Sequence, residues 1–281
     1  MKLSSTLSMN CKGKLLTFSR PMIMGILNIT PDSFFDGGKN NSLEQAVFQT
    51  QKMLNEGADI IDIGAYSSRP NADFVSEETE TERLIPIIEM LCKEFPDIVI
   101  SVDTFRANVA DQAIDAGAAI INDISGGNLD ENMFQTVARK EVPYILMHMR
   151  GTPQNMQQLT DYDDLVGDMM YYFSEKLNQA YEAGIKDVII DPGFGFSKTL
   201  EQNYELLSKL RLFQHLDVPI LVGVSRKSMI YNLLSTSPQE ALNGTTIINT
   251  MALMNGANIL RVHDVKAATE CVKLYMKTYE K

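Results

Sequence analysis

The sequence predicts a (β/α)8 barrel of the TIM type, preceded by a short β-hairpin. Eight apolar segments of strand length alternate along the chain with amphipathic segments of helical period. The length of 281 residues is typical of a single barrel of this kind. Nearly every apolar segment ends in a polar or charged residue, and barrel enzymes place their active sites at the carboxyl ends of the strands. An open doubly wound sheet has the same local patterns, but the count of eight units favours the barrel.

The N-terminal segment, residues 1–20, is predicted to form the hairpin. Residues 7–10 and 14–18 have strand character, and Lys12-Gly13 between them supplies a turn. We expect this hairpin to cover the bottom of the barrel. No change of composition, low-complexity linker or sequence repeat divides the chain, so residues 1–281 are expected to form one domain.

The first barrel strand, residues 22–29, is an apolar run that ends abruptly at Asn28. Apolar residues on both faces are typical of strands in a parallel sheet covered by helices. Thr30-Pro31 then forces an extended exit, and residues 30–38 contain two phenylalanines and a Gly-Gly pair. Long loops of this kind are usually functional or disordered, so we expect the functional site to begin here.

The rest of the chain alternates helix and strand without interruption. Amphipathic spacing predicts helices that begin after capping residues such as Ser42 and end at glycines such as Gly57, Gly117 and Gly184. The expected helices span residues 43–56, 77–95, 105–116, 133–140, 162–183, 200–212, 240–255 and 265–279. Apolar runs predict the remaining strands at residues 60–65, 98–103, 119–123, 144–148, 188–191, 220–225 and 259–262.

Composition excludes several classes of protein. The formal charge of −11 argues against binding to nucleic acid or to anionic lipid, both of which require basic surface. No apolar segment approaches the ~20 residues that span a bilayer, and the polar N-terminus lacks a signal-peptide core. Cys11, Cys92 and Cys271 lie too far apart to suggest a metal site or a disulfide framework. We therefore expect a cytoplasmic protein with reduced thiols and small-molecule ligands.

Polar side chains collect where the predicted strands end. These residues are Asn28, Asp103, Asn122, Asp123, His148, Asp191, Ser225, Arg226, Lys227, Arg261 and His263. Any one of them could be a helix cap or a solvated surface residue. Their convergence on one face of a barrel favours a ligand site.

The polar residues fall into two chemical groups. Cations suited to phosphate or diphosphate oxygens form the first group, which contains Arg69, Arg226, Lys227, Arg261 and His263. Donors and acceptors that could bind a planar heterocycle form the second, which contains Asp103, Asn122, Asp191 and Lys227. The implied ligand is a polar bicyclic ring that carries a diphosphate.

The segment DPGFGFSK, residues 191–198, follows the sixth barrel strand. Pro192 fixes a turn, Gly193 and Gly195 permit close approach of the backbone, and Phe196 offers an apolar wall. Neither GxGxxG nor GxxxxGK[ST] occurs, so a Rossmann or Walker phosphate loop is not supported. The three scattered histidines do not suggest a zinc site.

Eight motifs together carry a resemblance to a known family. In chain order they are NITPDSFFDGG, SSRP, SVDT, INDISGG, MHMRGTP, DPGFGFSK, GVSRKS and RVHDV. Over residues 22–265 the chain resembles the dihydropteroate synthases. The resemblance implies a pterin-binding barrel that joins 4-aminobenzoate to (7,8-dihydropterin-6-yl)methyl diphosphate, releasing diphosphate and making 7,8-dihydropteroate for folate synthesis. It also implies Mg²⁺ at the leaving group, a homodimer and a target of sulfonamides.

The same motifs carry the family's site residues onto this chain. The pterin would be held by Asp103, Asn122, Asp191, Lys227, Met147, Gly195 and Phe196. The diphosphate would contact Ser68, Arg261 and His263, and Asn28 would bind the Mg²⁺ ion. The 4-aminobenzoate would contact Phe34, Ser68, Arg69, Pro70, Lys227 and Ser228. The implied catalytic residues are Asp32, Asp103, Lys227 and Arg261.

The mechanism that the resemblance implies is dissociative. The C–O bond to the diphosphate breaks first, and the aromatic amine then attacks the cationic pterin methylene. Metal and cations make diphosphate a good leaving group, and an aniline nitrogen needs little activation by a base. This agrees with the lack of a Ser-His-Asp or Cys-His arrangement in the sequence. The loops at residues 30–38 and 67–72 would close over the aminobenzoate and exclude water.

The second loop departs from the family pattern, which is close to GGESTRPGA where this chain has GAYSSRPNA. Ala65 and Tyr66 replace Gly and Glu, Ser68 keeps a hydroxyl, and Asn71 tolerates the positive φ of the glycine that it replaces. Two other functions stay open. A methyltetrahydrofolate-dependent corrinoid methyltransferase shares pterin recognition but has no need of NITPDSFFDGG or SRKS. A catalytically inactive pterin-binding barrel is suggested by the altered loop.

Overall fold

The computed structural model describes residues 7–29, 39–66 and 75–279. Within them, eight parallel strands form one sheet in the order β8-β7-β6-β5-β4-β3-β10-β9. The strands are β3 (Met22–Asn28), β4 (Ile60–Gly64), β5 (Ile100–Asp103), β6 (Ile120–Asp123), β7 (Tyr144–Met147), β8 (Val188–Asp191), β9 (Leu221–Val222) and β10 (Ile259–Val262).

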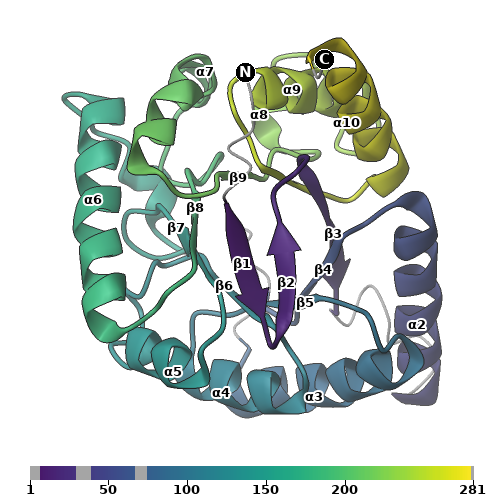
Figure 1. Cartoon of the computed structure of the whole chain (residues 1–281). Coiled ribbons are helices and arrows are strands. Elements are labelled where there is room, and N and C mark those ends of the chain that lie inside the picture. Colours follow the sequence, from purple (N-terminus) through teal and green to yellow (C-terminus); the bar gives the residue numbers. More distant parts are fainter. Residues whose placement is uncertain (1–6, 30–38, 67–74, 280–281) are drawn as a thin grey trace.

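The sheet closes between its two terminal strands, β8 and β9. Ile190 and Ile220 form a parallel bridge there, and the amide of Ile190 donates to the carbonyl oxygen of Pro219 at 3.0 Å. Helices follow the strands and form an outer ring around the sheet (Figure 1). The predicted (β/α)8 barrel is therefore confirmed.

Except for α8, which was not predicted, the helices of the outer ring agree with the predicted ones within a few residues. They are α2 (Lys39–Glu56), α3 (Glu77–Glu94), α4 (Ala107–Ala116), α5 (Met133–Lys140), α6 (Leu165–Ala183), α7 (Leu200–Lys209), α8 (Ser228–Tyr231), α9 (Leu242–Met254) and α10 (Val265–Tyr279). Side-chain caps fix several helix starts. Ser76 accepts from the amide of Thr79, and Thr199 forms a reciprocal capping box with Gln202.

Two helix predictions were inaccurate at one end, and two short helical segments were not predicted. Helix α2 begins at Lys39, so Ser42 lies inside it and is not its N-cap; the three residues after Lys39 are polar and give no apolar periodicity. The predicted helix at 200–212 is α-helical only to Lys209 and continues as the 3-10 segment η2 (Leu210–Leu216). Neither α8 nor the 3-10 turn η1 (Met156–Gln158) was predicted, because segments of four and three residues are too short to show periodicity.

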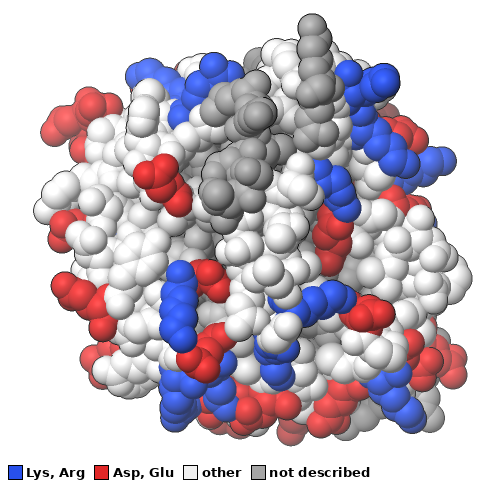
Figure 2. Space-filling model, in the orientation of Figure 1, with Lys and Arg blue, Asp and Glu red and all other residues white. Residues whose placement is uncertain are grey.

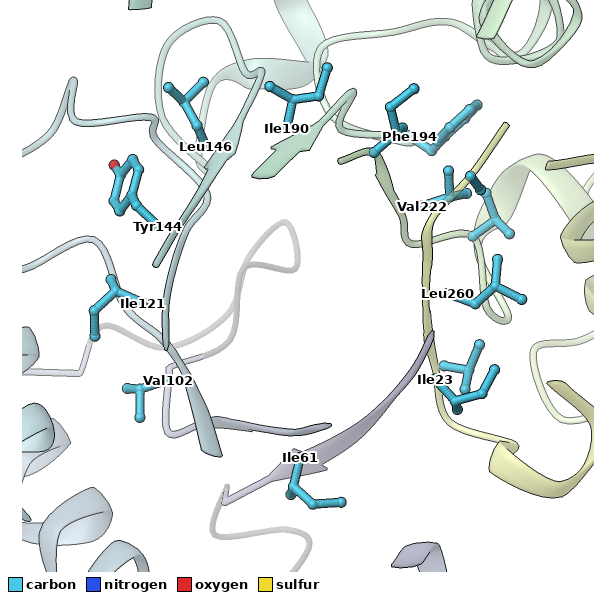
Figure 3. Packing of buried hydrophobic residues seen from close by; sticks show 14 of the residues in the cluster. Ile23, Ile61, Val102, Ile121, Tyr144, Leu146, Ile190, Phe194, Val222 and Leu260 are labelled. Carbon is cyan, nitrogen blue, oxygen red and sulfur yellow. The ribbon is translucent and has the colours of Figure 1, made fainter. Parts of the chain in front are cut away.

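Apolar side chains fill the space between the sheet and the helices. The strand residues that point away from the barrel axis surround the sheet in Figure 3, and include Ile23, Ile61, Val102, Ile121, Leu146, Ile190, Val222 and Leu260. Gly25 on β3 allows two helices to approach closely, since a Cβ there would lie 2.7 Å from Met53 of α2 and 3.1 Å from Val265 of α10.

A second apolar cluster fills the bottom of the barrel interior. Its strand residues are Met22, Met24, Ile60, Ile120, Ile145, Ile189, Leu221 and Ile259. The predicted hairpin, β1 (Ser8–Cys11) and β2 (Lys14–Thr17), packs Met9 and Cys11 on this cluster and lies across the centre of the ring in Figure 1. The amide of Asn10 donates to Asp187 at 2.8 Å.

The interior becomes polar one step farther along the strands. Side chains two residues apart on a strand share a face, so the residue two positions after each apolar floor residue also points inward. On five strands that position holds Asp62, Ser101, Asn122, Asp191 or Arg261. The apolar floor therefore supports a polar layer at the carboxyl ends of the strands, where barrel enzymes hold their ligands.

The surface on the hairpin side carries basic and acidic residues that are interspersed, with no extended field of one sign (Figure 2). In the described part of the chain, no helix combines the length and the apolar character needed to cross a membrane.

Candidate active site

Arg261 of β10 lies at the centre of the polar layer. Its Nε donates to Asp62 Oδ2 at 2.6 Å, and its Nη2 donates to Asp103 Oδ2 at 2.8 Å. Asn122 of β6 joins the same group, because its Nδ2 donates to Asp62 Oδ2 at 3.1 Å. The structure thus brings together the predicted residues Asp103, Asn122 and Arg261, which the chain separates by up to 158 positions.

Asp62 is a site residue that the sequence reasoning missed. It lies inside β4, in the segment IIDIG, and is completely buried. The prediction rests on residues at strand ends, and Asp62 lies two residues before the end of its strand. A charged residue at an inward position of an apolar strand was the available signal, because a buried carboxylate needs a partner of opposite charge.

Burial shifts the titration of Asp103. It raises the pKa of this carboxyl to about 7; the guanidinium of Arg261 opposes the shift, and the nearby carboxyls of Asp62 and Glu80 add to it. Asp103 therefore changes charge near neutral pH, in the range where site residues commonly titrate.

The segment after β8 supplies the opposite side of the site. Lys227, at the start of α8, donates from Nζ to the carbonyl oxygen of Phe194, and the same Nζ lies 4.8 Å from the ring centroid of Phe196. Burial lowers the pKa of Lys227 to about 8, although the carboxylate of Asp191 opposes this shift. Burial also raises the pKa of Asp191, and the positive charge of Lys227 opposes that rise. The predicted residues Asp191, Phe196 and Lys227 are therefore close neighbours.

Gly193 and Gly195 give this segment its shape. Both have a positive φ, of 67° and 82°. A Cβ on Gly193 would lie 2.2 Å from the carbonyl oxygen of His148, so only glycine fits there. The amide of Gly193 donates to Asp191 Oδ1 at 2.7 Å, which holds the carboxylate at the strand end.

Lys198 anchors the segment from below and was not predicted. It is buried, and its Nζ donates to the carbonyl oxygens of Gly193 at 3.1 Å and Phe196 at 2.9 Å. His148 Nδ1 lies 3.2 Å from the same nitrogen. Burial lowers the pKa of Lys198 to about 7, and burial with Lys198 lowers that of His148 well below its usual value. A neutral imidazole can accept from the ammonium.

An apolar wall lines the site between the polar groups. It consists of the buried residues Ile124, Met147, Met149 and Met156, with Phe105 and Phe196 packed against them. The predicted neighbours Met147 and Phe196 thus lie in one cluster, and such a surface suits the faces of a planar ring.

Asn28 and His263 line a separate part of the site. Both border a cavity of about 310 Å³ that lies beside α2, whose wall includes Lys52 and Glu56. Asn28 is exposed at the end of β3, and His263 Nδ1 lies 3.0 Å from Ser225 Oγ. Asn28, predicted for the metal, and His263, one of the residues predicted for the diphosphate, therefore share one cavity.

Three residues at predicted strand ends turn away from the site. Asp123 accepts from Tyr144 Oη at 2.6 Å and from Ser125 Oγ at 2.7 Å. His148 packs edge-on against Tyr172, with ring centroids 4.8 Å apart. Arg226, expected to bind phosphate, donates from Nε and Nη2 to Asp264, both at 2.8 Å. The convergence of all the strand ends was therefore overestimated.

Several predicted residues lie outside the described parts of the chain, namely Asp32, Phe34, Ser68, Arg69 and Pro70, together with all of the two loops at 30–38 and 67–72. Ser228 is described and is exposed next to Lys227. Tyr66, which stands where the family pattern has Glu, packs edge-on against Phe105 at 5.2 Å and accepts from Gln154 Nε2 at 3.0 Å.

The fold and this site define a pterin-binding enzyme. The family model described as "Pterin binding enzyme" matches residues 24–263. The chain belongs to this family.

Among its relatives, the chain is similar to dihydropteroate synthases. It is 49% identical to that of Synechocystis over 258 residues, which cover 91% of this chain and 89% of the relative. The crystal structure of the Yersinia pestis dihydropteroate synthase with a sulfonamide drug superposes with a TM-score of 0.92 at 43% identity, covering 98% of this chain and 100% of that one. The Xanthomonas albilineans enzyme with 4-aminobenzoic acid gives 0.91 at 38% identity, with 98% of each chain covered.

Proposed function

We propose that this protein is a transferase that condenses (7,8-dihydropterin-6-yl)methyl diphosphate with 4-aminobenzoate, giving 7,8-dihydropteroate and diphosphate in folate biosynthesis. One observation carries the proposal. At the carboxyl ends of the barrel strands, Arg261 binds Asp103 directly and Asn122 through Asp62. Asp191 and Lys227 lie close enough to interact electrostatically with Arg261, and an apolar wall lies beside the group. The similarity to dihydropteroate synthases supports the same reaction.

The pterin ring would lie between the polar residues and the apolar wall. The carboxylates of Asp103 and Asp191 accept hydrogen bonds from ring N–H and amino groups, while Lys227 donates to a ring carbonyl or nitrogen. Met147, Gly195 and Phe196 would contact the faces of the ring. The completely buried partner Asp62 keeps Arg261 in place behind the ring.

The diphosphate would extend toward Arg261 and His263, with Ser68 and Asn28 as further contacts. The donor atoms of the described residues fit Mg²⁺ only as a partial set of ligands. Asn28 offers one amide oxygen, and no group of three or more His, Cys, Asp or Glu residues in the described chain could hold a metal by itself. A cation bound mostly by phosphate oxygens and water suits such a site. When bound, Mg²⁺ would neutralise charge that develops on the leaving diphosphate.

The residues of the chain support a dissociative reaction. The bond between the pterin methylene carbon and the diphosphate oxygen breaks, and its electron pair leaves with the diphosphate, whose charge Arg261 stabilises. The amine nitrogen of 4-aminobenzoate then attacks the cationic methylene, and the resulting anilinium gives its proton to water. The proposed contacts of the aminobenzoate are Phe34, Ser68, Arg69, Pro70, Lys227 and Ser228, and Asp32 is proposed to act with Asp103, Lys227 and Arg261 in catalysis.

We also propose a homodimer that forms through α9. This helix contains no charged residue, yet Ile247, Met251 and Met254 are 44–47% exposed on one face. The spacing of four and three residues places them in one stripe. A second copy of the chain is the occupant that we propose for this stripe.

Two further proposals concern the chain as a whole. The family match over residues 24–263 and the packing of the hairpin on the barrel floor support one domain over residues 1–281. Cys11, Cys92 and Cys271 are all free, which supports a reducing compartment, the cytoplasm.

An assay of diphosphate release tests the function. Purified protein receives the pterin diphosphate with and without 4-aminobenzoate and with and without Mg²⁺. We expect rapid release of diphosphate and formation of dihydropteroate only when all components are present. Binding of the pterin without turnover would support the inactive barrel instead. A preference for methyltetrahydrofolate over the pterin diphosphate would support the corrinoid methyltransferase.

A further inference from the structure

Asp62 connects two residues of the proposed pterin site, Arg261 and Asn122, whose strands lie on opposite sides of β4 in the sheet. β4 is separated from β10 by β3, and from β6 by β5. Asp62 Oδ2 nevertheless accepts from both Arg261 Nε, at 2.6 Å, and Asn122 Nδ2, at 3.1 Å. A single oxygen therefore fixes one side chain from each direction.

The chemistry of a carboxylate decides how Asn122 must lie. An amide group has a donor end and an acceptor end, and either can face a ligand. Carboxylate oxygens only accept, so the NH2 group of Asn122 must face Asp62, and Oδ1 is left for the ligand. Without Asp62 this 3% exposed amide could rotate and present its NH2 group to the ligand instead.

Asp62 also selects the edge of Arg261 that a ligand meets. Asp62 binds Nε and Asp103 binds Nη2. Among the described residues, Nη1 has no hydrogen-bond partner, so its N–H groups are left for an anion.

Asp62 fits poorly as a residue that serves stability alone. It is completely buried, and its Oδ1 has no hydrogen-bond partner among the described residues. A buried polar atom without a partner costs folding free energy. Residues that cost stability are expected at functional sites.

We propose that Asp62 is a positioning residue that sets the polarity of the pterin site: it holds Asn122 as a hydrogen-bond acceptor toward the ring and Arg261 with Nη1 toward the diphosphate. This inference rests on the proposed function and deepens it. It implies that the ring portion next to Asn122 must be an N–H donor, as the pyrimidine half of a pterin provides.

The test compares Asp62→Asn with wild type by calorimetric titration of a pterin that carries a hydroxymethyl group and no diphosphate. We expect affinity for this ring to fall at least tenfold, because the Asn122 amide is released. Asp123→Asn is the matched control: it also removes a buried carboxylate, but Asp123 is turned away from the site. The control should retain ring affinity within twofold.

A double-mutant cycle shows whether Asp62 acts through Asn122. In the Asn122→Ala background, Asp62→Asn should change ring affinity less than twofold, because the residue to be positioned is gone. An equal loss in both backgrounds would overturn the proposal, as would a folded Asp62→Asn protein with wild-type ring affinity. Failure of the wild type to bind any pterin would instead refute the proposed function.

Neutron diffraction of wild-type crystals tests the amide orientation without any variant, and therefore serves if Asp62→Asn does not fold. Two deuterons on the Asn122 side-chain atom nearest Asp62 are expected. Deuterons on the atom that faces away from Asp62 would overturn the proposal.

Discussion

Asp103 and Lys227 carry opposite charges in an interior that disfavours both. Burial raises the pKa of Asp103 to about 7 and lowers that of Lys227 to about 8, despite the attraction of Arg261 for the first and of Asp191 for the second. The form with a charged carboxylate and a charged ammonium is therefore most abundant in a narrow range of pH.

The dependence of kcat/KM on pH follows from these two values. Below about 7 Asp103 gains a proton and loses its role as acceptor, and above about 8 Lys227 loses its proton and its charge. We expect a narrow bell-shaped profile with its maximum between these limits. Steady-state kinetics of Lys227→Arg should show the alkaline limb moved to higher pH, because arginine stays protonated. An unchanged alkaline limb would exclude Lys227 as its origin.

Lys227→Ala should harm catalysis far more than folding. Loss of a donor to the substrate should lower kcat/KM by about 10²-fold or more. The free energy of unfolding should change by about 1 kcal/mol at most, because burying the ammonium offsets much of what its contacts contribute. Lys209→Ala, which breaks the exposed pair with Glu205, is the control. Parallel kinetics and urea denaturation decide, and equal effects on both would contradict the role.

The site residues that lie at the ends of apolar strands could be predicted from the sequence. Asp103, Asn122, Asp191 and Arg261 end apolar strands or lie next to the last residue, and the structure brings them together. Successive residues of a strand point to opposite faces. For that reason Asp123, next to the inward Asn122, points outward, and a strand-end position alone was not enough to assign it.

At the scale of elements, the fold was predictable because strand and helix periodicities differ and every unit repeats them. Four elements were predicted with their observed boundaries: α5, β8, β10 and α10. Others shifted by a few residues where polar residues extend a helix, as at Lys39. Lys198 could not be predicted, because a lysine after a loop is normally solvated. Its burial depends on the loop carbonyls that fold around it.

The loop after β8 depends on Gly193, which can be tested against Gly13 of the hairpin. Both have a positive φ, but a Cβ at Gly13 would have no atom within 4 Å. Gly13→Ala should therefore cost only the conformational penalty, about 1 kcal/mol. Gly193→Ala adds a collision with the His148 carbonyl and should cost about 3 kcal/mol or more. Urea denaturation measures both. Equal losses would show that the loop tolerates the extra carbon.

At the scale of the whole molecule, the chain buries its apolar residues in the two shells of the barrel and leaves α9 as an uncharged, partly exposed helix. The similarity to the Yersinia pestis structure covers 98% of the chain, so nearly the whole architecture of this chain is shared with that protein.

Met251→Glu should convert the proposed dimer into a monomer, because it places a charge at the centre of the α9 stripe. Tyr171→Glu, on α6 and 70% exposed, is the control and should leave the oligomeric state unchanged. Sedimentation velocity of the three proteins measures their masses. A wild-type protein that sediments as a monomer would refute the dimer, and a dimeric Met251→Glu protein would place the interface elsewhere.

The closure between β8 and β9 gives the barrel one weak seam. β9 has only two residues and the contact with β8 is a single bridge, whereas β3 and β4 share five paired positions. Amide exchange should therefore be faster for Ile190 than for the β3–β4 pair.

Asp191 ends one side of this seam and Lys227 follows the other. A pterin held by both would tie the two sides together, so ligand binding should slow hydrogen–deuterium exchange most at residues 188–191 and 219–225. Uniform protection over all strands would contradict this. The bound substrate would then hold the barrel closed at the junction where its own strands are least tightly paired.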